Sequence, residues 1–280
     1  MLEMLPLWYQ YVLVGGVGLI IGSFLNVVIY RYHTGKSLNG HSHCLSCGQT
    51  LRWYELFPLV SYVCLRGRCG ACGCKIPLRY FLVELSTAVL FVLLFSKFGL
   101  GAFLLFSFVM VAMLMVVAVY DIYHMVIPDE LVLMMSALSV VYYLLTYGLT
   151  WSTPIFLAHA SAALGAFLFY GGLWFVSKGR WIGFGDAKLA IPLAFMLGPW
   201  ATFTFIVFSF WVGAIISVGI LAVPSLIAFI KKCCSTNGVV NSSKSFTIKS
   251  EVPFAPFMIV AFLLVYIYQL DVLTLMALVI

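Results

Sequence analysis

Long apolar segments alternate with short polar ones along almost the whole chain. An α-helix needs about 20 apolar residues to cross the hydrocarbon core of a membrane, and most of the segments reach that length. The sixth is shorter and ends at LGPW, which is typical of a half-helix or a kinked helix. The pattern predicts an all-α polytopic membrane protein with about eight transmembrane helices. They are expected over residues 11–30, 80–96, 102–120, 131–147, 155–177, 188–198, 201–230 and 254–278.

The composition points to the same class of protein. Hydrophobic residues make up 64% of the 280 positions and charged residues only 9%, whereas a soluble domain carries about 25% charged residues. The first apolar segment follows Glu3 and no cation. We therefore expect no cleavable signal peptide, because such a peptide begins with a positively charged region.

Polar residues divide the chain into parts. Residues 31–79 form the one sizeable polar insert, and a shorter insert lies at 231–250. We expect a first transmembrane helix within residues 1–30, a small loop module over 31–79, and a transmembrane domain over 80–280 that carries the second insert.

Lysine and arginine are distributed unevenly among the polar segments. If the N-terminus faces outward, fourteen of the fifteen lie in the inner segments or at their edge, and Lys97 is the exception. Such a bias keeps the basic loops in the cytosol. The net charge of +6 then follows from membrane orientation and from attraction to anionic lipids. It does not require a nucleic acid as a partner.

The insert contains two CxxC pairs, CLSC and CGAC, separated by 21 residues. This spacing is typical of a zinc site with four cysteine ligands, here Cys44, Cys47, Cys69 and Cys72. Two disulfides are the alternative, but a cytosolic loop is kept reduced. Four thiolates leave no open coordination position, so the zinc is expected to be structural. It stabilises a module too small to build a sufficient core.

Other metal-binding side chains lie near these pairs or in the second insert. The cysteines outside the two pairs are expected to be free thiols, with Cys74 as an alternative ligand. They are Cys64, Cys74, Cys233 and Cys234. His41 and His43 are interpreted as loop histidines.

The acids of the stretch AVYDIYHMVIPDELVL require separate interpretations. Asp129 follows Pro128 and precedes an apolar helix, where an aspartate caps free N–H groups and suits the positive end of the helix dipole. Glu130 fits the same structural role. Asp121 instead ends an apolar helix, where burial and the helix dipole both disfavour an ionised carboxylate. A functional role is therefore the better interpretation of Asp121.

Asp186, in WIGFGDAKLA, lies at the start of a helix. Gly183 and Gly185 permit tight turning and close approach of another backbone. The helix dipole favours ionisation of Asp186, although a simple cap and a pair with Lys188 are also possible. Two carboxylates with opposite protonation preferences, one taking a proton from water and one polarising a carbonyl, are what aspartic-protease chemistry requires. We accordingly expect Asp121 to hold the shared proton.

With these residues the chain resembles the type IV prepilin peptidases, the membrane aspartic proteases with a GxGD motif. In that family Asp121 matches the first catalytic aspartate and Asp186 the second. The paired CxxC motifs match its cytosolic zinc loop. Leu45, Phe81 and Ala255 depart from the family's usual proline, proline and glycine. The other matching stretches are GSFLNVVIYR (22–31), LVSYVCLRGRC (59–69), LVEL (82–85), GFGDAKL (183–189) and VPFAPF (252–257).

The resemblance implies a function that spacing alone does not. Such enzymes remove the basic leader from prepilins and pseudopilins at the cytosolic face of the bacterial inner membrane. Many then methylate the new N-terminal residue with S-adenosylmethionine, and chains with the cytosolic loop are generally bifunctional. No motif in the sequence locates the methyl-donor site. The polar residues Asn26, Arg31 and Glu84 either belong to that site or simply hold helix ends in place. The oligomeric state and the particular pilin are not determined by the sequence.

The main alternative is a transporter or channel in which Asp121 and Asp186 relay protons. Neither inverted repeats nor an acid midway through an apolar segment supports it. A membrane scaffold that presents the zinc module to a partner leaves Asp121 unexplained.

Overall fold

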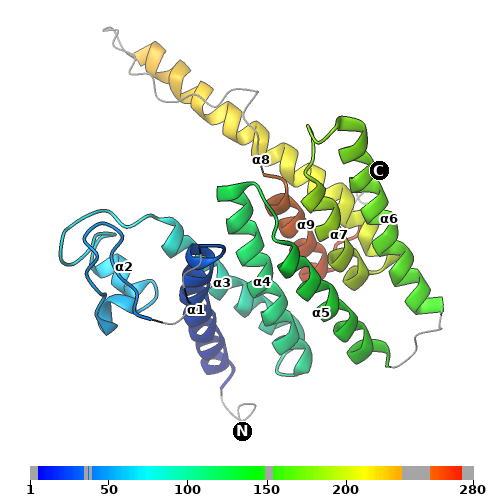
Figure 1. Ribbon diagram of the computed structural model, residues 1–280, viewed down its shortest axis with the longest axis horizontal. Helices are drawn as coiled ribbons and strands as arrows, with labels where there is room; N and C mark the ends of the chain where they lie inside the picture. Colours follow the sequence, from blue (N-terminus) through cyan, green and yellow to red (C-terminus); the bar gives the residue numbers. More distant parts are fainter. Residues whose placement is uncertain (1–5, 35–36, 38–39, 149–153, 235–252, 273–280) are drawn as a thin grey trace. The chain divides into compact units, whose positions relative to one another are not determined.

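The computed structural model describes residues 6–34, 37, 40–148, 154–234 and 253–272, with the backbone alone over 220–234. Its residues form two compact units, Met1–Tyr120 and Asp121–Ile280. Figure 1 follows the helices along the chain. Outside helices, the described residues form only two isolated antiparallel bridges, both in the loop module. The all-α fold class is therefore confirmed.

The first unit is built on two helices packed closely together, α1 (Leu7–Arg31) and α3 (Arg79–Phe98). Gly18 and Gly22 allow this approach: a Cβ added to Gly18 would lie 2.7 Å from the Cα of Ala88, and one at Gly22 would lie 2.8 Å from the Cα of Glu84. The loop module between the two helices contains only a 3₁₀ turn (Trp53–Leu56) and α2 (Val60–Cys64). The helix α4 (Ala102–His124) follows α3 and continues into the second unit.

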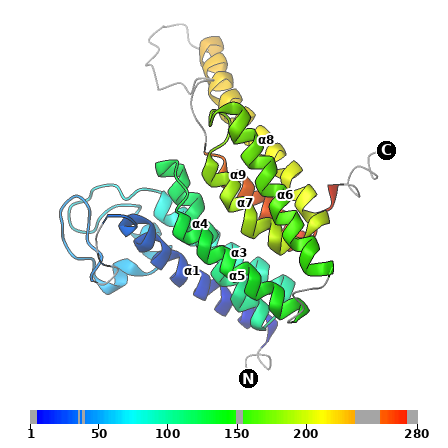
Figure 2. The same cartoon turned by 45° about the vertical axis from the view of Figure 1, so that its right-hand side comes forward.

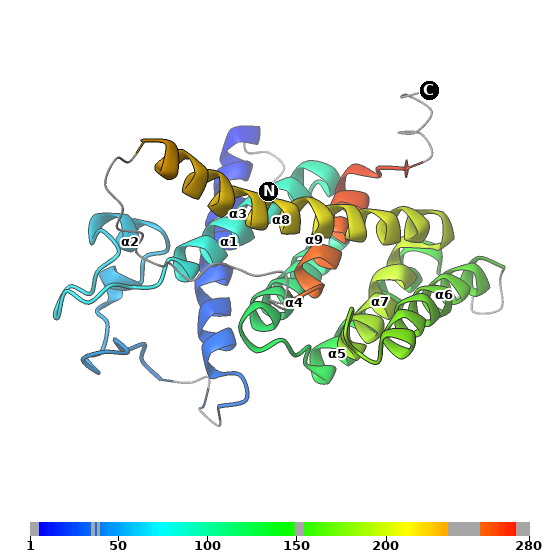
Figure 3. The same ribbon diagram turned by 90° about the horizontal axis from the view of Figure 1, so that it is seen from above.

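The second unit contains α5 (Asp129–Tyr147), α6 (Pro154–Ser177), α7 (Phe184–Leu197), α8 (Pro199–Cys234) and α9 (Ala255–Tyr268). Its centre is α7, which packs against each of the other four helices. Figure 2 shows α7 beside α6, and Figure 3 shows α9 beside α8. Most side chains of α7 are buried, so neighbours on several sides hold this short helix in place.

A buried histidine fixes the far end of α7. Nδ1 of His159 lies 2.6 Å from the carbonyl oxygen of Phe195 and donates to it. The last carbonyls of a helix have no intrahelical partner, so a side-chain donor there satisfies one of them. Gly198 follows the helix with a φ of +77°. A Cβ added to Gly198 would lie 3.1 Å from Cε1 of His159, so a larger residue would crowd the imidazole ring. This arrangement ties α6 to α7.

All eight expected helices form at their expected places. Six are long and apolar enough to cross a membrane: α1, α3, α4, α5, α6 and residues Pro199–Gly219 of α8. The other two, α7 and α9, have 14 residues each. At 1.5 Å per residue they are about 21 Å long, less than the roughly 30 Å hydrocarbon core. Eight complete crossings therefore remain a prediction.

The last helix ends earlier than expected. Its apolar pattern predicted a helix to residue 278, but α9 stops at Tyr268, where Gln269 adopts the left-handed conformation with its N–H bonded to the carbonyl of Val265. The predicted residues 273–278 lie outside the described residues. Asp271 beyond it accepts a hydrogen bond from Thr204 on α8. The division of the chain at residues 30 and 79 stays a prediction, and the insert at 231–250 lies mostly outside the described residues.

Candidate functional site: two buried carboxylates and a four-cysteine cluster

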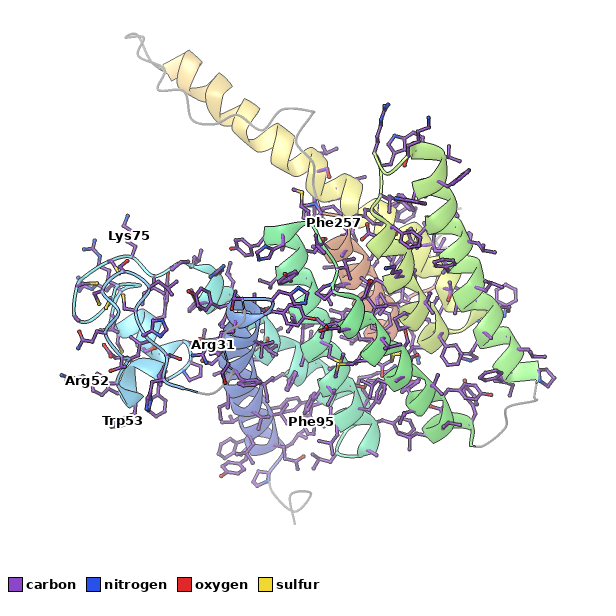
Figure 4. The ribbon with its side chains drawn as sticks, viewed as in Figure 1. Arg31, Arg52, Trp53, Lys75, Phe95 and Phe257 are labelled. Carbon is purple, nitrogen blue, oxygen red and sulfur yellow. The ribbon has the colours of Figure 1, made fainter. Side chains whose placement is uncertain are left out.

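Asp121 lies in the last turn of α4 with only 5% of its surface exposed. The backbone N–H of Ala255, at the start of α9, hydrogen-bonds to its carboxylate. Figure 4 labels Phe257, which belongs to the same first turn of α9. The other carboxylate oxygen, Oδ2, is buried and has no partner in the part of the chain that the structure describes. Since about nine in ten buried polar groups are paired, this oxygen is an exception and makes Asp121 a candidate for a functional role.

Asp186 has a matching environment in the first turn of α7. It is also 5% exposed, and its Oδ2 accepts a hydrogen bond of 3.0 Å from the N–H of Gly183, the residue that caps the helix. Its Oδ1 is buried and has no partner among the described residues. Asp186 therefore contributes to a helix cap with one oxygen and leaves the second for another purpose.

The two glycines of the GFGD stretch act through close approach and not through unusual backbone angles. A Cβ on Gly185 would lie 3.0 Å from Cβ of Ile127, in the segment that leads into α5. A Cβ on Gly183 would lie 3.3 Å from Oδ2 of Asp186. Neither glycine has a positive φ, so the expected close approach is confirmed and the tight turn is not.

The structure brings Asp121 and Asp186 together within the second unit. Burial, and then the charge of Asp121, raise the pKa of Asp186 to about 7, whereas the Gly183 N–H lowers it. Desolvation thus opposes the cap and the helix dipole at Asp186, and which of the two carboxylates holds the proton stays a prediction. The charge of Asp121 acts on Asp186, so the two carboxylates lie close enough to interact electrostatically.

Asp129 has a different structural role from the expected one. It is the first residue of α5, and the structure shows no side-chain cap at this helix. Its two carboxylate oxygens accept hydrogen bonds of 2.8 and 2.9 Å from Nζ of Lys188 on α7. Lys188 thus pairs with Asp129 and not with Asp186, although it lies two residues from Asp186 in sequence. Glu130 is exposed.

The loop module repeats one small backbone turn at each CxxC pair. The N–H of Gly48 donates to the carbonyl of Cys44, and the N–H of Gly73 donates to the carbonyl of Cys69. Both glycines have a positive φ, +71° and +68°, which suits glycine because it has no Cβ. Each CxxC pair is therefore followed by a glycine that bends the backbone.

The two turns bring four sulfur atoms together. The Sγ atoms of Cys44, Cys47, Cys69 and Cys72 all lie within 4.8 Å of one another. The Sγ atoms of Cys44 and Cys72 are 3.9 Å apart, close to the roughly 3.8 Å that tetrahedral zinc requires when each Zn–S bond is about 2.3 Å. These residues fit a zinc ion. In Figure 4, Lys75 marks this end of the module.

The surroundings favour a thiolate at Cys44 but not at every cysteine of the cluster. Hydrogen bonds from the backbone N–H groups of Cys47 and then Ser46 lower the pKa of Cys44 to about 6. For Cys72, a backbone hydrogen bond with Cys74 lowers the pKa, but hydrogen bonds with neighbouring thiols and burial raise it to about 12. Zinc ligands must be deprotonated, so a bound metal would have to displace the proton of Cys72. Cys74 lies 3.5 Å from Cys44, sulfur to sulfur, but it is outside the group of four.

The remaining histidines and cysteines of the loop module lie outside the four-cysteine cluster. Neither His41 nor His43 belongs to the metal-binding group found among the described residues. Cys64 and Cys74 are free thiols, while the side chains of Cys233 and Cys234 lie outside the described residues.

The three polar residues near the start of the module fasten backbone groups. Asn26 donates to the carbonyl of Tyr80, Arg31 donates to the carbonyl of Ser37, and Glu84 accepts from the N–H of Leu59. All three side chains also line one cavity of the first unit, so fastening is not their only possible role.

Sequence reasoning missed two partners of the site. The stretch VPFAPF was noticed only for its departure at Ala255, whose N–H contacts Asp121. The pair of Lys188 with Asp129 joins α5 to α7 and has no local sequence signal. Both are contacts between helices that are distant in the chain.

Fold and site together define a polytopic helical membrane protein with paired buried carboxylates and a four-cysteine module. The sequence model described as "Bacterial Peptidase A24 N-terminal domain" matches residues 17–98, and that of the "Type IV leader peptidase family" matches residues 108–218. The chain belongs to the type IV leader peptidase family. The resemblance in the sequence motifs is thereby confirmed, and the chain is a membrane peptidase of this family.

Curated relatives agree with this assignment. The chain is 30% identical over 272 residues to the "Type 4 prepilin-like proteins leader peptide-processing enzyme" of Escherichia coli O78:H11, covering 85% of this chain and 87% of the relative. It is 32% identical over 241 residues to the "Prepilin leader peptidase/N-methyltransferase" of Pseudomonas aeruginosa, covering 72% and 78%. The protein of the same name from Dichelobacter nodosus is 30% identical, covering 67% and 75%. No solved structure matches the chain at a comparable level.

Proposed function

We propose that this chain removes the basic leader peptide from type IV prepilins or pseudopilins and then methylates the new N-terminal residue. The names of its relatives support both reactions. The single observation that carries the cleavage is the carboxylate pair. Asp121 and Asp186 each keep one buried oxygen without a partner in the described part of the chain.

The pair suits hydrolysis of a peptide bond. One carboxylate, ionised, takes a proton from water while the water oxygen attacks the scissile carbonyl carbon. The other, protonated, donates to the carbonyl oxygen and stabilises the developing charge. When the C–N bond breaks, the carboxylate that took the proton from water donates it to the nitrogen of the leaving amine. The backbone N–H groups of Ala255 and Gly183 hold the two carboxylates in position.

Methyl transfer is assigned with S-adenosylmethionine as the methyl donor, by analogy with the relatives' names. When bound, that cofactor supplies an activated methyl group. Zinc, held by Cys44, Cys47, Cys69 and Cys72, supplies structure only, because four thiolates leave no position for a substrate. The prepilin and the lipid bilayer are the partners of this chain.

The site is assigned to the cytosolic face of the bacterial inner membrane. Fourteen of fifteen lysines and arginines lie in or beside the segments on one predicted side, and such segments stay in the cytosol. On this assignment the four-cysteine module and both aspartates face the cytosol, where a prepilin is still attached to its leader.

The direct test is a reaction with a prepilin. Full-length protein purified in detergent is mixed with a prepilin peptide, with and without S-adenosylmethionine, and the products are identified by mass. We expect loss of the leader in both mixtures and one added methyl group only with the donor. An unchanged peptide mass in a folded preparation would rule out the peptidase assignment and favour the proton-relay alternative.

A further inference from the structure

Tyr170 is a completely buried tyrosine in the second unit, and the proposed reaction does not use it. It lies on α6, the helix that packs against both α7 and α8 (Figure 2). A buried tyrosine hydroxyl needs a hydrogen-bond partner, because an unpaired polar group in such a place is costly. The contacts of the ring and of the hydroxyl therefore show what this side chain does.

The hydroxyl of Tyr170 is held by Ser209 on α8. The two hydroxyl oxygens are 2.7 Å apart, and the hydroxyl of Ser209 donates to the carbonyl of Ile206, also at 2.7 Å. A hydroxyl has a single proton, so Ser209 accepts the proton of Tyr170. That proton points toward α8 and is not offered to either carboxylate, which excludes Tyr170 as an acid in the reaction.

The ring of Tyr170 packs on the segment that holds Asp121. Its centroid lies 6.1 Å from that of Phe254 and 6.2 Å from that of Phe210, and these two rings are 5.4 Å apart. Phe254 directly precedes Ala255, whose N–H hydrogen-bonds to Asp121. Three mutually packed rings, from α6, α8 and the start of α9, therefore support this hydrogen bond.

The same face of α6 also contacts the segment that carries Asp186. Trp174 follows Tyr170 by four residues, so the two side chains lie on one face of the helix. The ring of Trp174 is 4.9 Å, centroid to centroid, from that of Phe184, which lies two residues before Asp186. The hydroxyl of Tyr170 is itself close enough to Asp186 to interact with its charge. One face of α6 thus contacts both segments that carry or hold a carboxylate of the pair.

We propose that Tyr170 is a positioning residue for peptide cleavage, which fixes where the Asp121 carboxylate lies relative to that of Asp186. The inference rests on the proposed peptidase function and adds a residue to it. The hydrogen bond to Ser209 keeps the ring against Phe254, and this contact keeps the N–H of Ala255 aimed at Asp121. Both carboxylates must reach the water and the scissile carbonyl at once, and a displacement of about 1 Å lowers such a rate by roughly a hundredfold.

Two other roles compete with positioning. A tyrosine that only fills the interior would affect melting temperature and the yield of folded protein, but not the rate per folded molecule. A tyrosine that contacts the substrate would affect KM. The full burial of Tyr170 argues against substrate contact, and its place between the two carboxylate segments argues against simple filling.

The test compares two buried tyrosines. Tyr170→Phe keeps the ring and removes the hydroxyl. Tyr143→Phe is the matched control, because Tyr143 is also almost fully buried but packs against Phe195 near the other end of α7. Ser209→Ala removes the same hydrogen bond from its other side, so it tests the inference even if Tyr170→Phe does not fold.

Three quantities are measured on full-length protein in detergent. They are kcat and KM for a prepilin peptide, the melting temperature, and the affinity for an uncleavable peptide. In that peptide a tetrahedral carbon bearing a hydroxyl replaces the scissile carbonyl, so it resembles the transition state. Calorimetry gives its affinity without any turnover.

We expect Tyr170→Phe to lower kcat by about threefold to tenfold, as loss of one hydrogen bond does, and to change KM by less than about twofold. Binding of the uncleavable peptide should weaken by a similar factor. Ser209→Ala should act in the same direction, and the double variant should be no worse than Tyr170→Phe, since the two hydroxyls form one contact. Tyr143→Phe should change kcat by less than about twofold.

Three results would overturn the inference. Tyr170→Phe and Ser209→Ala that both keep the original kcat and the original affinity for the uncleavable peptide exclude the positioning role. Equal losses in Tyr170→Phe and Tyr143→Phe, in step with lower melting temperatures, assign Tyr170 to core packing. A raised KM with unchanged kcat makes it a substrate contact. If the original protein cleaves no prepilin peptide, the peptidase assignment itself fails, and this inference with it.

Discussion

The two carboxylate oxygens of each aspartate have different surroundings. One oxygen accepts a backbone N–H at the start of a helix, from Ala255 for Asp121 and from Gly183 for Asp186. The other oxygen remains buried without a partner in the described residues. In the proposed mechanism the two carboxylates share a proton, because neighbouring buried carboxylates do not both ionise easily. Asp129 differs, because both its oxygens are occupied by Lys188 at an exposed position.

This difference predicts which acids are essential. Asn is close to Asp in shape but cannot take a proton from water, so Asp121→Asn and Asp186→Asn should each reduce leader cleavage by about 10³-fold or more. The double variant should be no worse than either single one, since the two residues act as a unit. Cleavage of a prepilin peptide by purified variants, with folding checked for each, provides the measurement.

Asp129→Asn is the matched control. It removes an exposed ion pair, which contributes about 0–1 kcal/mol, so most activity and stability should remain. An inactive Asp129→Asn beside an active Asp121→Asn would show that the first catalytic acid had been assigned to the wrong residue. Methylation of a precleaved pilin should survive Asp186→Asn.

The pKa of Asp186 predicts the pH dependence of cleavage. Burial and the charge of Asp121 raise this pKa from 3.8 to about 7, and the reaction needs the proton that the pair shares. The cleavage rate should therefore fall as the pH rises through about 7. A pH profile of kcat from about pH 5 to about pH 9 tests this. A rate that keeps rising across that range would contradict a shared proton.

The free energy of unfolding should also depend on the protonation of Asp186. A pKa that is raised in the folded state stabilises the fold at pH values below the unfolded pKa, and this contribution is lost as the pH rises through the folded one. The original protein should lose stability between about pH 4 and 7, by a few kcal/mol at most, whereas Asp186→Asn should not. As the pH rises across this range, the melting temperature of the original protein should fall relative to that of Asp186→Asn.

At the scale of elements, a few specific contacts hold the short helix α7 and the loop module in place. Neighbouring helices hold α7 along its length, with His159 at one end and the Asp186 cap at the other. The module has little helix and no strand among its described residues. A metal bound by its two cysteine turns would therefore supply stability that the module otherwise lacks.

This dependence predicts the effect of removing a ligand. Cys69→Ser should lower zinc content below the one ion per chain that a four-thiolate site implies, and it should lower the yield of folded protein. Cys64→Ser should do neither, because Cys64 is exposed and lies outside the cluster. Metal analysis with a chromatographic check of folding distinguishes the two. Full zinc loading of Cys69→Ser would refute the assignment.

At the scale of the whole molecule, the distribution of basic residues predicts orientation in the membrane. Gly101→Cys introduces a thiol into the predicted outer connection, at an exposed position where a Cβ meets nothing within 4 Å. Arg180→Cys places one in a predicted inner segment. In intact cells, an impermeant thiol reagent should label the first above background and not the second. The reverse pattern would overturn the cytosolic placement of the site.

The sequence by itself determined the features that depend on local pattern. Apolar runs located all eight helices, since about 20 such residues favour the membrane wherever they occur. The four cysteines that cluster in the structure followed from CxxC spacing, because one tight turn brings the two sulfurs of each pair together. Asp121 stood out because its helix end disfavours a carboxylate. The lengths of α7 and α9 were less predictable, because apolar residues alone do not show where a helix stops.

Only the tertiary structure decided how these parts meet. The N–H of Ala255 reaches Asp121 from a distant helix, and Lys188 turns to Asp129 although Asp186 is nearer in sequence. The burial that raises the pKa of Asp186 is also a tertiary effect, since desolvation depends on what surrounds the side chain and not on its neighbours in sequence. Such contacts arise from the packing of several helices at once, and no periodicity along the chain encodes them.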